Sequence, residues 1–152
     1  SKGVLERNHA RLYNELMMAQ NQRCATCGAD FSKGECEIEL DHVVPHALGG
    51  DCSFGSNWQL LCSHCNLGKK DLLSPMQHRY AKNWVYSLEG YFPPNDKPQS
   101  LVNIRYAVLR RDRKCTTCGK SPQEGELGVE KIHSTGLTIP DNLQTHCINE
   151  CK

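Results

Sequence analysis

Two short segments, IELDHVVP at residues 38–45 and NWQLLCSHCNLGKK at residues 57–70, decide the fold of this 152-residue chain. Alternating and β-branched residues in the first segment predict a strand, and the apolar start of the second predicts a returning strand. A Gly-Gly pair lies between them, in a region that we expect to turn. The second segment then continues through a cysteine pair into a predicted helix. We therefore expect a hairpin followed by a helix that brings Asp41, His42 and Asn66 together.

Eight of the ten cysteines form four close pairs, which are Cys24/Cys27, Cys62/Cys65, Cys115/Cys118 and Cys147/Cys151. Two or three residues between partners allow both thiolates to bind one tetrahedral metal ion, whereas a disulfide between such close neighbours is often strained. We predict two structural zinc sites, one from the first two pairs and one from the last two. A secreted disulfide framework is the alternative interpretation. Cys36 and Cys52 stand apart, and we expect free thiols of unassigned role.

The two halves of the chain resemble each other. RCATCG at residues 23–28 is repeated as KCTTCG at residues 114–119, and apolar residues with helical spacing precede each copy. Each copy is followed by a His and then by an Asn five residues ahead of the second cysteine pair. This repetition predicts a duplicated zinc-stapled module, and metal binding would supply folding free energy to modules with little core.

The charge is unevenly distributed, although the net charge is only +1. Residues 66–114 hold ten Lys or Arg against four Asp or Glu, whereas residues 1–65 and 115–152 are acidic overall. A basic zone indicates a polyanionic partner, with a solvated helical surface as the alternative. Within this zone Ser74-Pro75 predicts the start of a helix that ends near Gly90, and Ser100 predicts a second helix that runs to about Asp112.

Hydropathy excludes a membrane protein, because no run approaches eighteen apolar residues. No charged-then-apolar leader opens the chain, so we expect a cytoplasmic protein. The chain begins with Ser rather than Met, which is compatible with a piece of a longer protein.

The ordered features of residues 20–72 resemble the HNH endonuclease family in its zinc-stapled form. These features are Cys-x-x-Cys, Asp-His-x-x-Pro, Gly-Gly, Asn, Leu-Leu-Cys-x-x-Cys-Asn and a following Lys. Asn66 stands where many members have the last His. The resemblance implies an α+β fold of small zinc-stabilised ββα-metal modules, here duplicated and joined by a helical bridge. The expected units are a catalytic module with an N-terminal helix (1–73), a basic bridge (74–114) and a degenerate module (115–152).

The resemblance implies a metal-dependent endonuclease that hydrolyses double-stranded DNA with a single metal ion. Asp41 and Asn66 would bind a catalytic Mg²⁺ or Mn²⁺, because hard cations prefer oxygen ligands. His42 would act as general base near physiological pH, and Asn57 would tie the active-site loop together. The expected DNA contacts are Lys69, Lys70, Arg105, Arg110, Arg111, Arg113 and Lys114. The alternative is a non-catalytic zinc-stabilised nucleic-acid-binding module, and we expect either a homodimer or part of a larger chain.

The second module is expected to be catalytically inactive. Aligned on the His of each half, it keeps His133 and Asn142 but has Ile132 in the place of the catalytic Asp. Lys152 falls in the place of the metal-binding Asn, so both oxygen ligands are missing. Glu130, two residues before Ile132, would face the same side of a strand but would lack a second donor.

Overall fold

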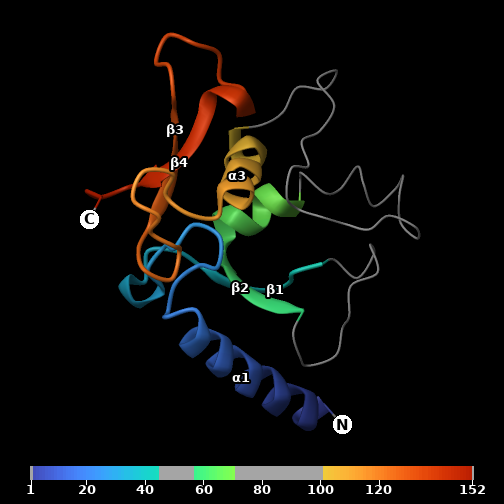
Figure 1. Cartoon of the computed structure of the whole chain (residues 1–152). Helices are drawn as coiled ribbons and strands as arrows, with labels where there is room; N and C mark the ends of the chain where they lie inside the picture. The colour runs from blue at the N-terminus through green and yellow to red at the C-terminus, as the bar shows by residue number, and fades with distance from the viewer. Residues whose placement is uncertain (1, 45–56, 71–100, 152) are drawn as a thin grey trace.

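The computed structural model describes residues 2–44, 57–70 and 101–151 (Figure 1). In chain order the elements are α1 (Lys2–Ala19), the 3-10 turn η1 (Phe31–Lys33), β1 (Ile38–His42), β2 (Trp58–Cys62), a helix that includes residues 63–70, α3 (Leu101–Asp112), β3 (Leu127–Lys131), the 3-10 turn η3 (Pro140–Asn142) and β4 (Leu143–Cys147). This mixture of helices and small antiparallel sheets confirms the predicted α+β class. The Gly-Gly turn, the helix predicted after Ser74, and Cys52 lie outside the described residues.

The strands form two separate antiparallel hairpins with the same register. In the first, β1 pairs with β2 so that Ile38 lies opposite Cys62 and Asp41 opposite Gln59. In the second, β3 pairs with β4 so that Leu127 lies opposite Cys147 and Glu130 opposite Gln144. Each hairpin therefore ends its returning strand on the first cysteine of a pair.

The cysteine turns repeat the same backbone hydrogen bonds, so the internal likeness seen in the sequence extends to the structure. In each half the glycine after the first pair donates to the carbonyl of the first cysteine, over 2.9 Å for both Gly28 to Cys24 and Gly119 to Cys115. The residue after that cysteine donates to the middle of the returning strand, as Ala25 does to Leu60 over 3.1 Å and Thr116 to Thr145 over 3.0 Å.

Helix α1 covers the first hairpin through one apolar face. Leu12 is buried, and Leu16, one turn further on, packs against the core. Just after the helix, the Gln20 side chain donates to the carbonyl of Leu60 and accepts from its amide, each over 2.9 Å. Together with the bond from Ala25, this pair of bonds satisfies the outer edge of β2 at Leu60.

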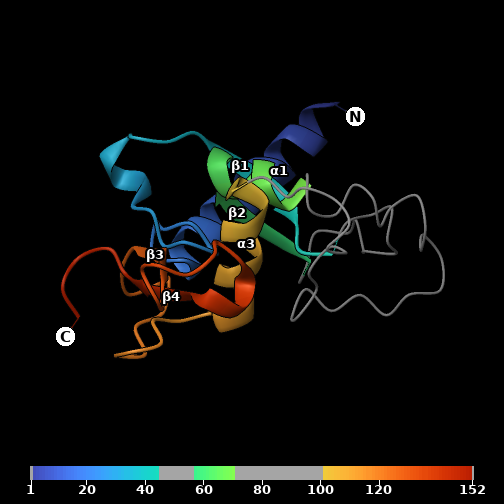
Figure 2. The same cartoon turned by 90° about the horizontal axis from the view of Figure 1, so that it is seen from above.

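Helix α3 lies between the two hairpins, which Figures 1 and 2 show from two directions. Its buried residues include Tyr106, Ala107, Val108 and Leu109. The helix also crosses the 63–70 helix at Gly68, where an added Cβ would lie 2.6 Å from the carbonyl oxygen of Val102. Only a residue without a side chain permits this approach, so Gly68 sets how closely α3 packs on the first module.

A single buried cluster includes residues from both halves, and it extends from Phe31 and Leu60 to Tyr106 and Leu127. The halves also meet at Gly28, which has a φ of +74° and leaves no room for a Cβ beside the carbonyl oxygen of Gly125. Close by, the amide of Leu127 donates to the carbonyl of Cys27 over 2.7 Å. Each half thus completes the core of the other. None of the helices in the described parts of the chain is long and apolar enough to cross a bilayer.

Candidate active site and zinc centres

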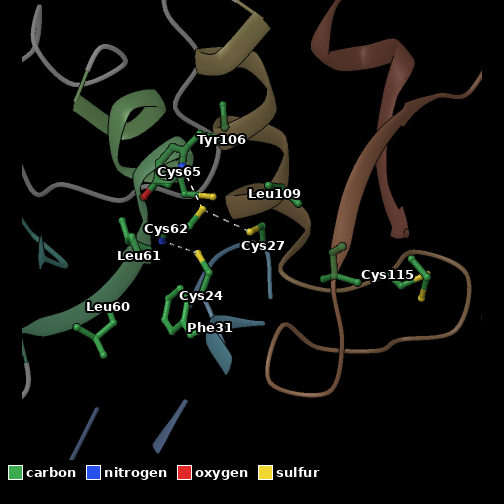
Figure 3. Packing of buried hydrophobic residues seen from close by; sticks show 13 residues of the cluster. Cys24, Cys27, Phe31, Leu60, Leu61, Cys62, Cys65, Tyr106, Leu109 and Cys115 are labelled. Atoms are coloured by element: carbon green, nitrogen blue, oxygen red, sulfur yellow. Dashed lines mark hydrogen bonds between the residues drawn. The ribbon is translucent and has the colours of Figure 1, made fainter. Parts of the chain in front are cut away.

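The first cysteine tetrad has the geometry of a zinc site. The Sγ atoms of Cys24, Cys27, Cys62 and Cys65 lie within 4.8 Å of one another, and all four residues are buried (Figure 3). Cys27 Sγ and Cys62 Sγ are 3.8 Å apart. A tetrahedral ZnS₄ centre with Zn–S bonds of about 2.3 Å separates its sulfurs by about 3.8 Å. The tetrad could therefore hold a structural zinc ion without rearrangement.

The second tetrad has similar dimensions but is less enclosed. Cys115, Cys118, Cys147 and Cys151 again place their Sγ atoms within 4.8 Å of one another, with Cys118 and Cys151 partly exposed. No disulfide forms among the nine described cysteines, so none competes for these ligands. The two four-cysteine groupings predicted from the sequence are both present. Cys36 is a half-buried free thiol that packs against the core.

Asp41, on β1, is held from two sides. Gln59 lies opposite on β2 and donates from Nε2 to Asp41 Oδ2 over 3.0 Å. Lys69 reaches the same oxygen from the 63–70 helix and also donates to the backbone carbonyl of His42. Both bonds end on Oδ2, so the carboxylate is fixed in one orientation.

His42 and Asn66 each carry a buried polar atom that lacks a partner among the described residues. These atoms are His42 Nε2 and Asn66 Oδ1. The His42 ring lies against Trp58, with ring centroids 3.9 Å apart and planes tilted by 34°. His42 follows Asp41 in β1, and Asn66 lies one helical turn before Lys69, which bonds to Asp41. Buried polar atoms are nearly always hydrogen-bonded, so these two atoms are candidates for ligand binding.

The loop after β1 is tied to the start of β2 by Asn57. Its Oδ1 accepts from the amide of Val44 over 2.8 Å, and its Nδ2 donates to the Val44 carbonyl over 2.9 Å. The amide of Val43 donates to the Asn57 carbonyl over 2.9 Å. These three bonds fix the backbone directly after Asp41 and His42.

The donor set fits a hard divalent cation. Such ions take oxygen ligands and keep several waters, so a few protein oxygens suffice. Asn66 offers a buried amide oxygen without a donor, and Asp41 offers a carboxylate whose Oδ1 accepts no hydrogen bond from the described residues. Asp41 and Asn66 are therefore suitable ligands for Mg²⁺ or Mn²⁺.

Lys69, one of the expected DNA contacts, is buried in this structure. Its side chain is only 2% exposed and forms an ion pair with Asp41. Burial lowers the pKa of the Lys69 ammonium, while Asp41 acts in the opposite direction. A buried lysine needs a charged partner, and this one finds it inside the protein rather than on a ligand.

Two arginines of α3 that were expected to contact DNA form hydrogen bonds inside the protein. Arg105 Nη1 lies 3.3 Å from Cys65 Sγ and donates to it. Arg111 donates to Asp112 and to the carbonyls of Pro140 and Leu143. The exposed basic residues among those expected to bind DNA are Lys70, Arg113 and Lys114, whereas Arg110 is partly buried.

The alignment proposed for the second hairpin is wrong by two residues. Counted back from Cys147, the register places Glu130 at the position of Asp41, and its partner Gln144 donates to it over 3.2 Å, as Gln59 does to Asp41.

His133 occupies the position of Val44 rather than that of His42, and it receives the same pair of bonds from an asparagine. Asn142 Oδ1 accepts from the His133 amide over 2.9 Å, and Asn142 Nδ2 donates to the His133 carbonyl over 3.0 Å. The second hairpin thus has a carboxylate in place, but Lys131 replaces the histidine.

Sequence reasoning missed three neighbours of the site, which are Gln59, Trp58 and the inward-facing Lys69. A cross-strand partner depends on the hairpin register, which the sequence leaves open when the turn is long. The sequence held one signal for Gln59, because both halves have a Gln two residues after the Asn of the repeated motif. Lys69 gave no such signal, because burial of a lysine depends on how α3 packs over the 63–70 helix.

Comparison with known proteins gives a family match in the first module. Residues 24–72 match the family model described as HNH endonuclease, a segment that covers about a third of the chain. The match contains both cysteine pairs of the first tetrad and the Asp41 site. It does not extend over the second hairpin. No curated protein and no solved structure gives a significant match to the chain.

Proposed function

We propose that the chain is a metal-dependent endonuclease that hydrolyses phosphodiester bonds of double-stranded DNA, of the restriction or defence type. The observation that carries the proposal is that two buried atoms, His42 Nε2 and Asn66 Oδ1, have no partner among the described residues. A scaffold that only binds nucleic acid has no need of such atoms, and leaving each one without a partner costs about 1–3 kcal/mol. The family match of residues 24–72 supports the same chemistry.

The residues of the first module suit the roles that hydrolysis requires. His42 would take the proton of the attacking water at Nε2, and the Trp58 ring behind it would hold the imidazole in place. Asp41 and Asn66 would hold Mg²⁺ or Mn²⁺, which supplies charge neutralisation of the phosphate and of the leaving oxygen when it is bound. Gln59 orients Asp41, and Asn57 fixes the loop that follows.

The two cysteine tetrads support a proposal of two structural zinc ions per chain. Thiolates are soft ligands, so these ions should survive a mild EDTA treatment that removes Mg²⁺. Elemental analysis of the treated protein should find two zinc ions per chain, and fewer than about one would contradict the assignment. Zinc binding at these tetrads requires reduced cysteines, which supports our proposal of a reducing compartment such as the cytoplasm.

The exposed cations Lys70, Arg113 and Lys114 are the residues we propose to contact DNA phosphates. One chain offers a single complete catalytic set, so a double-strand break requires two chains or two successive nicks. A two-fold dimer on a palindromic site, or incorporation in a larger chain, would supply the second set.

The alternative function is a nucleic-acid-binding module without catalysis, and one observation favours it. The carboxylate of Asp41 is already neutralised by Lys69, so the site has its charge balanced without a metal ion. Incubation of the zinc-loaded protein with supercoiled plasmid distinguishes the two functions. The nuclease gives nicked or linear plasmid with Mg²⁺ or Mn²⁺ and none after EDTA, whereas the binding module retards the plasmid and leaves it supercoiled.

A further inference from the structure

Lys69 is a buried cation attached to the carboxylate that would hold the catalytic ion. Its side chain is 2% exposed, and that of Asp41 is 15% exposed. The ammonium donates to Asp41 Oδ2 and to the carbonyl of His42, and it therefore bridges two consecutive residues of β1. The next residue along the helix, Lys70, is exposed. The inward direction of Lys69 is thus specific to this position.

The ammonium and a divalent ion would compete for the same negative charge. Asp41 is the one acidic residue that the structure pairs with Lys69 among the described residues. A divalent ion held by Asp41 and Asn66 would lie close to the ammonium, and two positive charges a few ångströms apart in a partly buried site repel each other strongly. Asp41 can therefore pair with the Lys69 ammonium or bind the divalent ion, but not both at once.

We propose that Lys69 is a tethered counter-ion, which holds Asp41 while the ion is absent and is displaced from it when the divalent ion binds. This inference rests on the proposed function, because it assumes that Asp41 and Asn66 bind the ion. Lys69 is then a positioning residue. It keeps the carboxylate oriented and the buried charge balanced, and it weakens the apparent affinity for the ion by the free energy needed to break the Lys69–Asp41 pair.

Ion binding measured without DNA tests the exchange. Mn²⁺ affinity of the zinc-loaded full chain can be obtained from the EPR signal of free Mn²⁺, for the parent and for Lys69→Met, Lys70→Met and Asp41→Asn. Removal of the tethered cation should tighten Mn²⁺ binding about tenfold in Lys69→Met. The matched Lys70→Met control should bind like the parent, and Asp41→Asn should lose the site. Equal affinity of the parent and Lys69→Met overturns the exchange.

A second measurement uses the unaltered protein, so it holds even if Lys69→Met fails to fold. Reductive methylation followed by mass spectrometry reports how accessible each lysine amine is. Lys69 should be modified slowly without the ion and at least severalfold faster at saturating Mg²⁺, while Lys70 is modified at the same rate in both conditions. A Lys69 that stays protected at saturation overturns the inference. Absence of any Mn²⁺ binding that depends on Asp41 would reject both the inference and the proposed nuclease, whereas the other negative outcomes reject the inference alone.

Discussion

Arg105 of α3 donates a hydrogen bond to Cys65 Sγ over 3.3 Å, which connects the helix leading to the second module with the first cysteine tetrad. Burial by itself would lower the pKa of Arg105, but the negative charge of Cys65 raises it above its ordinary value. The guanidinium therefore stays charged beside the sulfurs. A ZnS₄ centre carries a net charge of −2, so a buried cation next to it is stabilising.

Arg105→Met should weaken zinc binding at the first tetrad while the second tetrad keeps its ion. Loss of a hydrogen-bonding partner of a ligand typically costs 10–100-fold in metal affinity, and we expect a change of about tenfold. Transfer of zinc to a chromophoric chelator should show one of the two ions released faster than in the parent. Arg11→Met, at an exposed position of α1 away from both tetrads in sequence, is the matched control. Unchanged release of both ions would show that Arg105 contributes packing only.

Gln59→Leu should impair the site without loss of zinc. The substitution removes the donor that orients Asp41 from the opposite strand, so both Mn²⁺ affinity and the cleavage rate should fall by about tenfold. Gln144 occupies the same register position in the second hairpin and donates to Glu130. Gln144→Leu should leave both quantities within twofold of the parent. Equal losses in the two variants would indicate a general effect on hairpin stability.

Much of the first module could be predicted from its sequence, because its signals are local. The cysteine spacings gave the tetrads, and alternating apolar residues gave β1 and β2. In the bridge, the helix predicted from Ser100 to about Asp112 is observed from Leu101 to Asp112. These features depend on residues that are near one another in the chain.

The other features of the site depended on contacts between the two halves and on the strand register of the second hairpin. The inward positions of Lys69 and Arg105 follow from α3 packing on the 63–70 helix at Gly68, which no local pattern encodes. The alignment of the second hairpin on His133 failed because histidine is a less constant marker than the Asn-to-Cys spacing, which both hairpins share. The Asn-to-Cys spacing aligns the two returning strands, but only the observed register places Glu130 opposite Gln144.

Asp112 makes the stability of the second hairpin dependent on pH. Its Oδ2 accepts from the Thr145 amide over 2.8 Å, the same strand position that the neutral Gln20 satisfies in the first hairpin. Burial alone would raise the pKa of Asp112, but hydrogen bonds from Arg111 and Thr145 lower it below its ordinary value. A lowered folded-state pKa means that this stabilisation is complete above the unfolded pKa and is lost as the pH falls through the folded one.

Asp112→Asn should therefore lower the free energy of unfolding by about 1.5 kcal/mol at pH 7, because hydrogen bonds to an ionised acceptor are lost. The difference between parent and variant should stay constant from pH 7 to about 5. It should shrink below about pH 4, where the carboxyl of the unfolded chain is protonated first and that of the folded protein at lower pH. Urea unfolding of both proteins at each pH measures this difference in the free energy of unfolding. Loss of zinc at low pH affects the parent and the variant alike. A difference that grows on acidification would contradict the sign of this shift.

The central claim is that the first hairpin catalyses hydrolysis and the second does not. The most direct test is the initial rate at which zinc-loaded His42→Ala and His133→Ala convert supercoiled plasmid in the presence of Mg²⁺. Loss of a general base should slow His42→Ala by about 10²–10⁴-fold with zinc content and fold intact. His133→Ala should cleave within about twofold of the parent, because its backbone rather than its imidazole bonds to Asn142. Near-parent cleavage by His42→Ala, or an equal loss in His133→Ala with zinc still bound, would contradict the account.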